Sequence, residues 1–281
     1  MREFLVENFD SIEHLILANE RPLNPVFAGR PELESNGSDY AGFYKTKTYE
    51  EAVDLLRYGY DAPLEQIKKG IQANVSGSVP SKTSVKVDIV GYAPHVPNAV
   101  IGIPQSMINT ATIAKKAKIV SIVYDSTNAG CTSAEDYIKA GVAVLSVISS
   151  LELAGYRVAL KVLFKSAEAN CQTIVSALKV KDWRQPLDLK KIAFPICHPS
   201  MHRRIGFRGT ETIPGLTDRS MGGDYGTNLS AKYRSDPKKL ISLLVENRVI
   251  SDKEVFINIP MCQSNRFDPV RLTEACGLGK E

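Results

Sequence analysis

Long hydrophobic runs are missing from this sequence of 281 residues. No uninterrupted apolar stretch approaches the roughly 20 residues that a membrane-spanning helix needs. The first residues, MREFLVENFDSIEHL, carry acidic side chains where a signal peptide would have a basic flank and an apolar core. Both absences predict a cytoplasmic protein that has no contact with a membrane.

Cysteine is scarce, and its five residues form no C-x-x-C pair. Their odd number and wide spacing argue against a disulfide framework and against a cysteine-based zinc site. Catalytic motifs are missing as well: there is no G-x-S-x-G elbow, no P-loop Lys-Ser/Thr, and no G-x-G-x-x-G after a strand. The sequence therefore favours a protein that is not an enzyme, and no catalytic residue is predicted.

The composition that is present, 43% hydrophobic and 23% charged, suits one large or two small domains with a proper core. Apolar residues recur at helical spacings over residues 2–18, and two further helices are expected within residues 49–71. The segment ANVSGSVPSK has the Gly, Pro and Ser content of a linker. We therefore predict a helical N-terminal region, residues 1–83, and an α/β domain, residues 84–281.

Within the second region, strand and helix patterns alternate. Strands are expected at residues 85–89, 118–124, 156–164, 171–180 and 254–259, and helices at 105–114, 133–154, 187–207 (in two pieces) and 236–247. Only KSAEAN separates the strands at 156–164 and 171–180, and so short a connection favours an antiparallel hairpin. The predicted fold is a doubly wound, mostly parallel sheet with one antiparallel hairpin at its edge.

A polar loop follows the buried strand at 118–124, and it contains Asp125, Ser126, Thr127 and Asn128. In open α/β sheets ligands bind beyond the carboxyl ends of the strands, so these four residues are the predicted ligand or partner site. The alternative is that they only form a turn, with Thr132 and Glu135 as the capping box of the next helix.

The order over residues 118–180, a buried strand ending in Asp-Ser-Thr, a long helix, a strand and an antiparallel strand, resembles the von Willebrand factor A-like fold. The resemblance covers roughly residues 84–260 and is one of layout more than of motif. It implies a Mg²⁺ site in which the family's aspartate falls on Asp125 and its two serines on Thr127 and Ala129. Ala129 has no hydroxyl, so the implied cofactor is either Mg²⁺ held by Asp125 and Thr127 or none. Further ligands would come from later loops, where the candidates are Thr210, Thr212, Thr217, Asp218 and Asp224.

Three phrases, TKTYEEAVDLLRYGY, DIVGYAPHVP and LELAGYRV, resemble an uncharacterised family encoded by phages and other mobile elements. That resemblance implies a setting, the host cell cytoplasm, and no mechanism. Our leading hypothesis is a protein-interaction or structural module of such an element, with a von Willebrand A-like core. It would engage a protein partner near Asp125, and an oligomer is compatible with it.

Basic charge is concentrated in the second half of the chain. Residues 1–150 have 14 basic and 17 acidic side chains (14 − 17 = −3), and residues 151–281 have 21 and 14 (21 − 14 = +7). Arg203, Arg204 and Arg208 are the predicted anion site, because guanidinium groups match phosphate geometry. His198 and His202, four residues apart, could share a helix face as metal ligands. The alternative functions are therefore nucleic-acid binding through the arginines and metal-dependent hydrolysis at the Asp125 loop.

Overall fold

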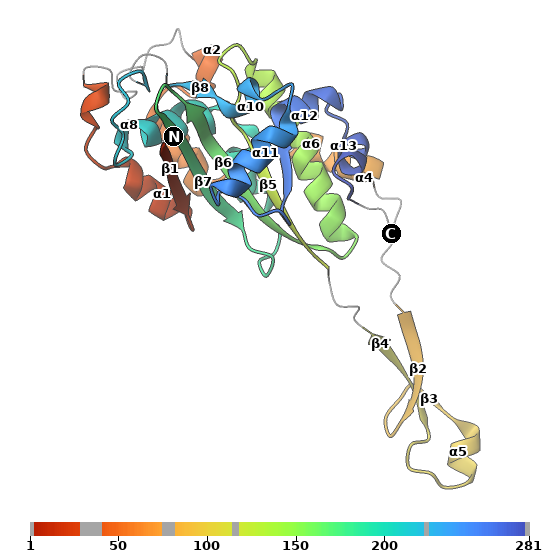
Figure 1. Ribbon diagram of the computed structural model, residues 1–281. Coiled ribbons are helices and arrows are strands. Elements are labelled where there is room, and N and C mark those ends of the chain that lie inside the picture. The colour runs from red at the N-terminus through yellow and green to blue at the C-terminus, as the bar shows by residue number, and fades with distance from the viewer. Residues whose placement is uncertain (1–2, 29–40, 75–81, 114–117, 222–224, 279–281) are drawn as a thin grey trace.

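The computed structural model describes residues 3–28, 41–74, 82–113, 118–221 and 225–278 (Figure 1). The elements of the first half are β1 (Glu3–Phe9), α1 (Ile12–Asn19), the 3₁₀ turn η1 (Pro25–Phe27), α2 (Ala41–Tyr44), α3 (Tyr49–Tyr58), α4 (Leu64–Asn74), β2 (Lys82–Asp88), β3 (Ala93–Pro94), α5 (Val96–Val100), β4 (Met107–Ile113) and β5 (Ile119–Asp125). Those of the second half are α6 (Ala134–Leu153), β6 (Arg157–Glu168), β7 (Gln172–Lys181), α7 (Leu189–Cys197), the π-helix η4 (Met201–Gly206), α8 (Phe207–Thr212), β8 (Thr227–Asn228), α10 (Leu229–Lys232), α11 (Pro237–Glu246), β9 (Val255–Asn258), α12 (Ile259–Ser264) and α13 (Pro269–Ala275).

The central sheet has the strand order β1-β7-β6-β5-β9, and β8 pairs with the end of β6. Strands β5, β6 and β9 are parallel to one another, while β7 is antiparallel to β6. The predicted α/β class, the mostly parallel sheet and the β6–β7 hairpin are therefore confirmed. The prediction that this hairpin forms the edge is wrong, because β1 pairs with β7 in parallel, with Leu5 opposite Ile174.

Strand β1 lies where the sequence predicted a helix over residues 2–18. Its apolar side chains alternate between the two faces of the sheet, since Phe4 and Val6 pack against one core cluster and Leu5 against another. That alternation is the signature of a strand, and the helix begins only at Ile12, after the N-cap Ser11. The first region is therefore not purely helical. Its strand β1 belongs to the central sheet, so the predicted boundary at residue 83 does not divide the chain into a helical part and a sheet part.

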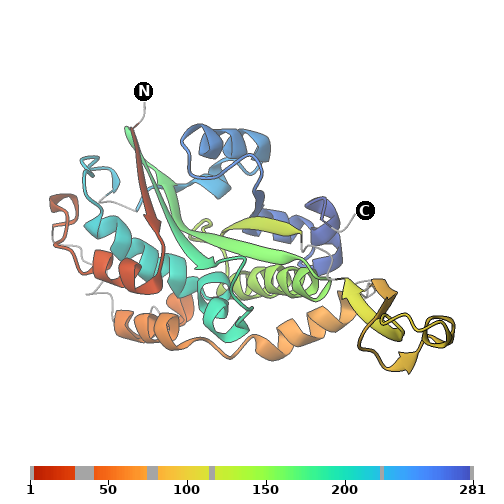
Figure 2. The ribbon, with the colours of Figure 1, turned by 90° about the horizontal axis from the view of Figure 1, so that it is seen from below.

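Helices cover both faces of the central sheet (Figure 2). Helices α6 and α7 bury one face, and α3 and α4 pack on the outside of this pair. The other face is covered by α10 and α11, which place Leu229, Leu240 and Leu244 over the strands. Because α6 has neighbours all round, its sequence is apolar on nearly every side.

Helix α6 was predicted at residues 133–154, and its position is confirmed. Its N-cap is Ser133, whose hydroxyl accepts a hydrogen bond from Asp136 N at 3.0 Å, so the predicted capping box at Thr132 is one residue too early. A Cβ atom at Gly141 would lie 2.5 Å from the Cα of Cys197. Glycine is thus what allows α6 and α7 to approach so closely.

A second, small sheet projects from this body, with the order β2-β4-β3 and helix α5 between β3 and β4 (Figure 1). We call residues 82–113 the arm. The predicted strand at 85–89 is confirmed as β2, but the predicted helix at 105–114 is wrong, because Met107–Ile113 form strand β4, antiparallel to β2. None of the helices in the described ranges combines the length and the apolar character that crossing a membrane requires.

Candidate functional site

Asp125 ends strand β5 and is completely buried. Its Oδ1 accepts hydrogen bonds from Thr127 N (2.9 Å) and from the Thr127 hydroxyl (2.6 Å). Its Oδ2 accepts from the hydroxyls of Ser230 (2.6 Å) and Ser166 (3.3 Å). Asn258, at the end of β9, donates in turn to Ser230 Oγ at 3.2 Å. Burial raises the pKa of the Asp125 carboxyl, and the hydroxyl donors oppose this rise.

This arrangement does not fit a Mg²⁺ ion. A carboxylate offers about four lone-pair positions, and four protein donors already point at those of Asp125. Each hydroxyl uses its hydrogen on the carboxylate, and among the described residues no second acidic side chain bonds to this group. The implied metal role of Asp125 and Thr127 is therefore corrected to a buried hydrogen-bond network that joins β5, β6, β9 and α10.

The later-loop ligand candidates serve other purposes. Thr210 and Thr212 donate their hydroxyl hydrogens to the helix carbonyls of Gly206 and Arg208. Thr217 donates to Gln172, and Asp218 accepts from Cys171 N and Ser220 N. Asp224 lies outside the described residues. In those parts of the chain that the structure describes, no group of three His, Cys, Asp or Glu side chains could hold a metal.

The remaining residues of the predicted loop divide into two groups. Ser126 turns inward and donates its hydroxyl hydrogen to Leu163 O at 3.1 Å. Asn128 accepts from Ala129 N at 2.9 Å and lines a pocket at the surface. Only the end of the loop, from Asn128 onward, therefore faces a space that a ligand could fill.

Arg203 and Arg204 are buried and bind backbone carbonyls of the N-terminal region and of the Asp125 loop. Arg203 donates to Phe43 O (2.7 Å) and Thr132 O (2.5 Å), and its guanidinium lies between the rings of Phe43 and Tyr137, 3.8 and 4.7 Å from their centroids. Arg204 donates to Thr46 and Lys47. Both arginines tie distant chain segments together.

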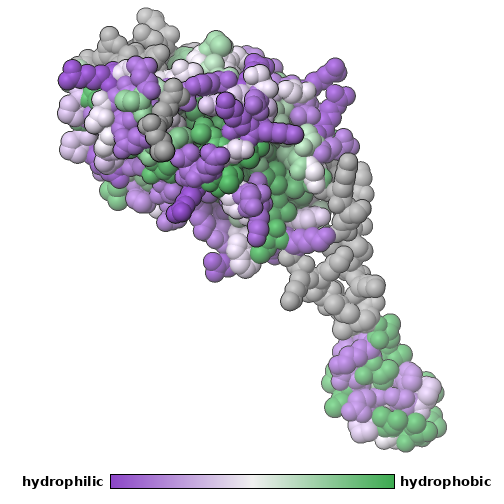
Figure 3. Space-filling model, in the orientation of Figure 1, coloured by the Kyte–Doolittle hydropathy of each residue, from purple (hydrophilic) through white to green (hydrophobic). Residues whose placement is uncertain are grey.

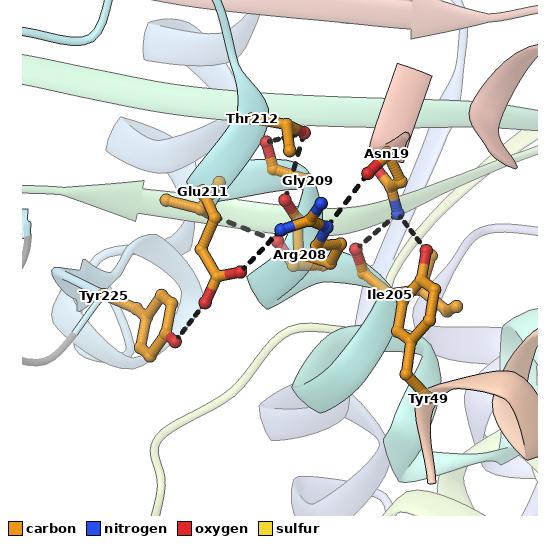
Figure 4. Close-up of polar contacts among 10 residues, drawn as sticks. Asn19, Tyr49, Ile205, Arg208, Gly209, Glu211, Thr212 and Tyr225 are labelled. Atoms are coloured by element: carbon orange, nitrogen blue, oxygen red, sulfur yellow. Dashed lines mark hydrogen bonds and ion pairs between the residues drawn. The ribbon is translucent and has the colours of Figure 1, made fainter. Parts of the chain in front are cut away.

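Arg208 belongs to a third buried cluster (Figure 4). Its Nε donates to Asn19 O at 2.9 Å, and its Nη1 lies 3.5 Å from the carboxylate of Glu211, which is fully buried. Tyr225 donates its hydroxyl hydrogen to the other carboxylate oxygen of Glu211 at 2.7 Å. All three arginines are buried, so they present no basic surface to nucleic acid, and of the predicted anion site only Arg203 lines a pocket.

The structure does contain a pocket of about 360 Å³ beside the Asp125 loop. It opens beyond the carboxyl end of β5 and along the last residues of β6, where open α/β sheets bind ligands. The side chains that define its chemistry are Phe43, Asn128, Lys165, His202, Arg203, Phe207 and Tyr225. Phe207 and Tyr225 are stacked 4.2 Å apart, and Lys165 Nζ lies 5.3 and 5.4 Å from their ring centroids.

A family model described as "Domain of unknown function (DUF7192)" matches residues 3–273 of the chain. The chain belongs to the DUF7192 family. No curated protein and no solved structure was found to match it. The match takes in the whole central sheet of this DUF7192 chain, the arm and the pocket.

The positive charge of Arg203 determines which ligands the pocket of this DUF7192 protein favours. The guanidinium is bonded to carbonyl oxygens, which have only partial negative charge, and no acidic side chain of the described residues lies within ion-pair distance of it. A second groove, on the sheet at the other end of β6, differs in this respect. Its lysines Lys161, Lys179 and Lys181 are each paired with a carboxylate.

His202 supplies a hydrogen-bond acceptor to the same pocket. Its Nδ1 lies 3.0 Å from Phe164 O, and because a carbonyl can only accept, Nδ1 carries the hydrogen. Burial and the nearby Lys165 lower the pKa of His202 to about 3, so the ring is neutral and Nε2 is left as an acceptor. The pocket is thus lined by a positive charge on Arg203 and a hydrogen-bond acceptor on His202, two consecutive residues of η4.

Buried neutral histidines should make this DUF7192 chain sensitive to acid. The pKa of His202 is about 3 in the folded chain and about 6.5 when unfolded. The unfolded state therefore binds more protons between these values, and stability is lost as the pH falls from 6.5 toward 3. His202→Asn, which keeps a donor near the Nδ1 position, should reduce the loss by about 1.4 kcal/mol per pH unit. Urea unfolding at pH 7, 6 and 5 measures both slopes, and equal slopes would contradict the assignment.

The sequence did not predict the residues that surround Asp125 and complete the pocket. Ser166, Ser230 and Asn258 complete the Asp125 network, and Lys165 and Phe207 complete the pocket. All lie 40 or more residues after Asp125, in stretches without a recognisable motif. Lys165 in the strand pattern VLFKSAE was a usable signal. A lysine inside a sheet is rarely buried without partners, so its position indicates that polar groups from other segments lie nearby.

Proposed function

We propose that the protein is a non-enzymatic interaction module with a von Willebrand A-like sheet, which binds an acidic segment of a protein partner in the pocket beside Asn128. The single observation that carries this proposal is the buried guanidinium of Arg203 at the pocket wall, held by carbonyls and without a carboxylate partner among the described residues. A cation desolvated in this way favours an anion that completes its pairing.

The ligand chemistry follows from the pocket lining. A carboxylate would pair with Arg203, and a nearby N–H would donate to His202 Nε2. An aspartate or glutamate in a peptide carries both groups, one on its side chain and one on its backbone. The stacked rings of Phe207 and Tyr225 suit the methylene part of such a side chain.

The fold-level part of the proposal rests on strand order. The succession β5-α6-β6-β7, with β7 antiparallel to β6, supports it, whereas β1, which pairs with β7, has no place in the layout that the resemblance implies. A pocket beside a loop with alanine at the family's second serine position supports the proposal of such a fold without its ion. The setting in a phage or mobile element remains part of this proposal and rests on the sequence phrases alone.

The proposal is tested with N-acetylglutamate amide, which has a carboxylate and a backbone N–H, and with N-acetylglutamine amide as the uncharged control. Isothermal titration or NMR should detect saturable millimolar binding of the glutamate compound and at least tenfold weaker binding of the glutamine compound. Absence of saturable binding by the glutamate compound would overturn the proposal.

A pair of variants places the binding in the pocket. Ala231 lines the pocket and is half-buried on α10. Ala231→Glu adds a carboxylate that competes for Arg203, and it should abolish binding of N-acetylglutamate amide. Ala231→Gln, of the same size and without charge, should retain binding within about threefold. Equal binding by the two variants would place the ligand elsewhere and contradict the proposal.

A further inference from the structure

Residues 85–109 of the arm, whose side chains the structure describes, form no core of their own. No side chain of its residues 85–109 is buried, and none of them belongs to a core cluster of the protein. A sheet is stable when it buries one face against another layer, and three short strands with one turn of helix cannot supply that layer. None of the described residues of the body buries residues 85–109, which makes the arm a candidate contact surface.

Apolar side chains are concentrated on the arm (Figure 3). Of the sixteen large hydrophobic residues that are exposed among the described residues, eight belong to the arm, and these eight expose 38–78% of their surface: Val85, Ile89, Val90, Tyr92, Val96, Val100, Ile101 and Ile103. On the body such residues are spread singly over several elements, as with Leu17, Tyr58 and Leu153. Isolated apolar residues are normal on a surface, whereas a cluster of eight marks a contact.

Charge argues against nucleic acid or an anionic membrane as the partner of the arm. Within residues 82–113 the charged side chains are Lys82, Lys86 and Asp88, and Lys86 pairs with Asp88 at 2.7 Å. A surface so close to neutral is complementary to another apolar, neutral surface, such as the arm of a second copy of this chain.

The edge of the small sheet points to the same partner. β2 pairs with β4 on one side and lies at the edge of the sheet, so its outward N–H and C=O groups have no strand beside them in the described structure. Two β2 strands related by a twofold axis can pair in antiparallel fashion, which joins two three-stranded sheets into one of six strands. This pairing satisfies the two β2 edges, and apolar side chains beside the seam from the two arms come into contact with one another.

The exposed area matches what such a dimer needs. An exposed Val, Ile or Tyr offers on the order of 100 Å² of apolar surface, so the eight side chains expose about 800 Å² on each arm. This upper limit on what the contact can bury equals the share of one partner in a standard interface. We infer that the arm is a dimerisation element, which packs against the arm of a second copy of this chain along strand β2.

The test is the mass of the full chain in solution, measured by light scattering coupled to size exclusion at 10–100 µM. The expected mass is twice the 30.8 kDa of one chain. Val90→Glu with Val100→Glu places two charges in the contact and should raise the dissociation constant at least 100-fold. Leu153→Glu, at a comparably exposed site on α6, is the matched control and should leave the dimer intact.

A second measurement keeps the inference testable if the double variant does not fold. In the wild-type chain, hydrogen exchange of the outward β2 amides should slow as concentration rises, because pairing protects them. A monomer at 100 µM, a dimer that the arm variants do not weaken, or exchange of the β2 amides that is independent of concentration would each overturn the inference. So would association of the monomeric chain with phosphatidylcholine vesicles through the arm.

Discussion

Asp125→Ala is expected to lower the free energy of unfolding by about 3 kcal/mol, because it leaves several buried donors without an acceptor. The hydroxyls of Thr127, Ser166 and Ser230 all point at this carboxylate, and none of these residues is more than 2% exposed. Relief of the desolvated charge offsets only part of this loss. Urea unfolding at pH 7 measures the difference between the variant and the wild type.

Asp125→Asn is the matched control for this change. Its amide oxygen can accept from Thr127, and its NH₂ group can donate to serine hydroxyls that rotate to accept, so the loss should be clearly smaller than for alanine. MgCl₂ should leave the unfolding midpoint unchanged, because the lone pairs of the carboxylate are already in use. An alanine variant within 1 kcal/mol of the wild type would show that the network does not hold the sheet together.

Arg208→Met is the second large effect, with an expected loss of about 3–5 kcal/mol in the free energy of unfolding. The substitution keeps most of the side-chain volume but removes the cation beside the buried Glu211 carboxylate and the donor to Asn19 O. Glu211 keeps the Tyr225 hydroxyl as a donor, but removing one partner of a buried ion pair costs more than the intact pair contributes.

A double-mutant cycle with Glu211→Gln separates these effects. The Arg208→Met/Glu211→Gln chain has neither charge, so it should be more stable than Arg208→Met alone, even though it carries one more substitution. Glu211→Gln keeps an acceptor for the Tyr225 hydroxyl. Losses that simply add would mean that Arg208 acts through packing rather than through its charge.

The parts of the fold that the sequence predicted are those with an unambiguous period. β5, α6, β6, β7, α11 and β9 were placed within a few residues because each has an apolar pattern of its own. β1 was missed because its seven residues run almost directly into α1, and a window over both shows helical spacings. β4 was missed because its pairing partner β2 lies across two turns and helix α5.

The candidate site was harder to predict, since its chemistry depends on contacts between distant segments. The loop after Asp125 was found at the edge of a pocket, yet Asp125 itself turned out to be a structural group. Three arginines in one short segment looked like a basic surface. Their acceptors, Phe43, Thr46 and Asn19, lie about 160–190 residues earlier, and nothing local in the sequence announces that pairing.

Parallel pairing of β1 with β7 also constrains how the chain is made. Glu3 aligns with Gln172 and Phe9 with Leu178, so β1 has no neighbour in the sheet until about 170 more residues have been translated. At ribosomal rates of roughly 5–20 residues per second, that interval lasts on the order of 10–30 s. During it, the apolar FLV segment has no strand to pair with, and an unpaired apolar strand favours wrong pairing.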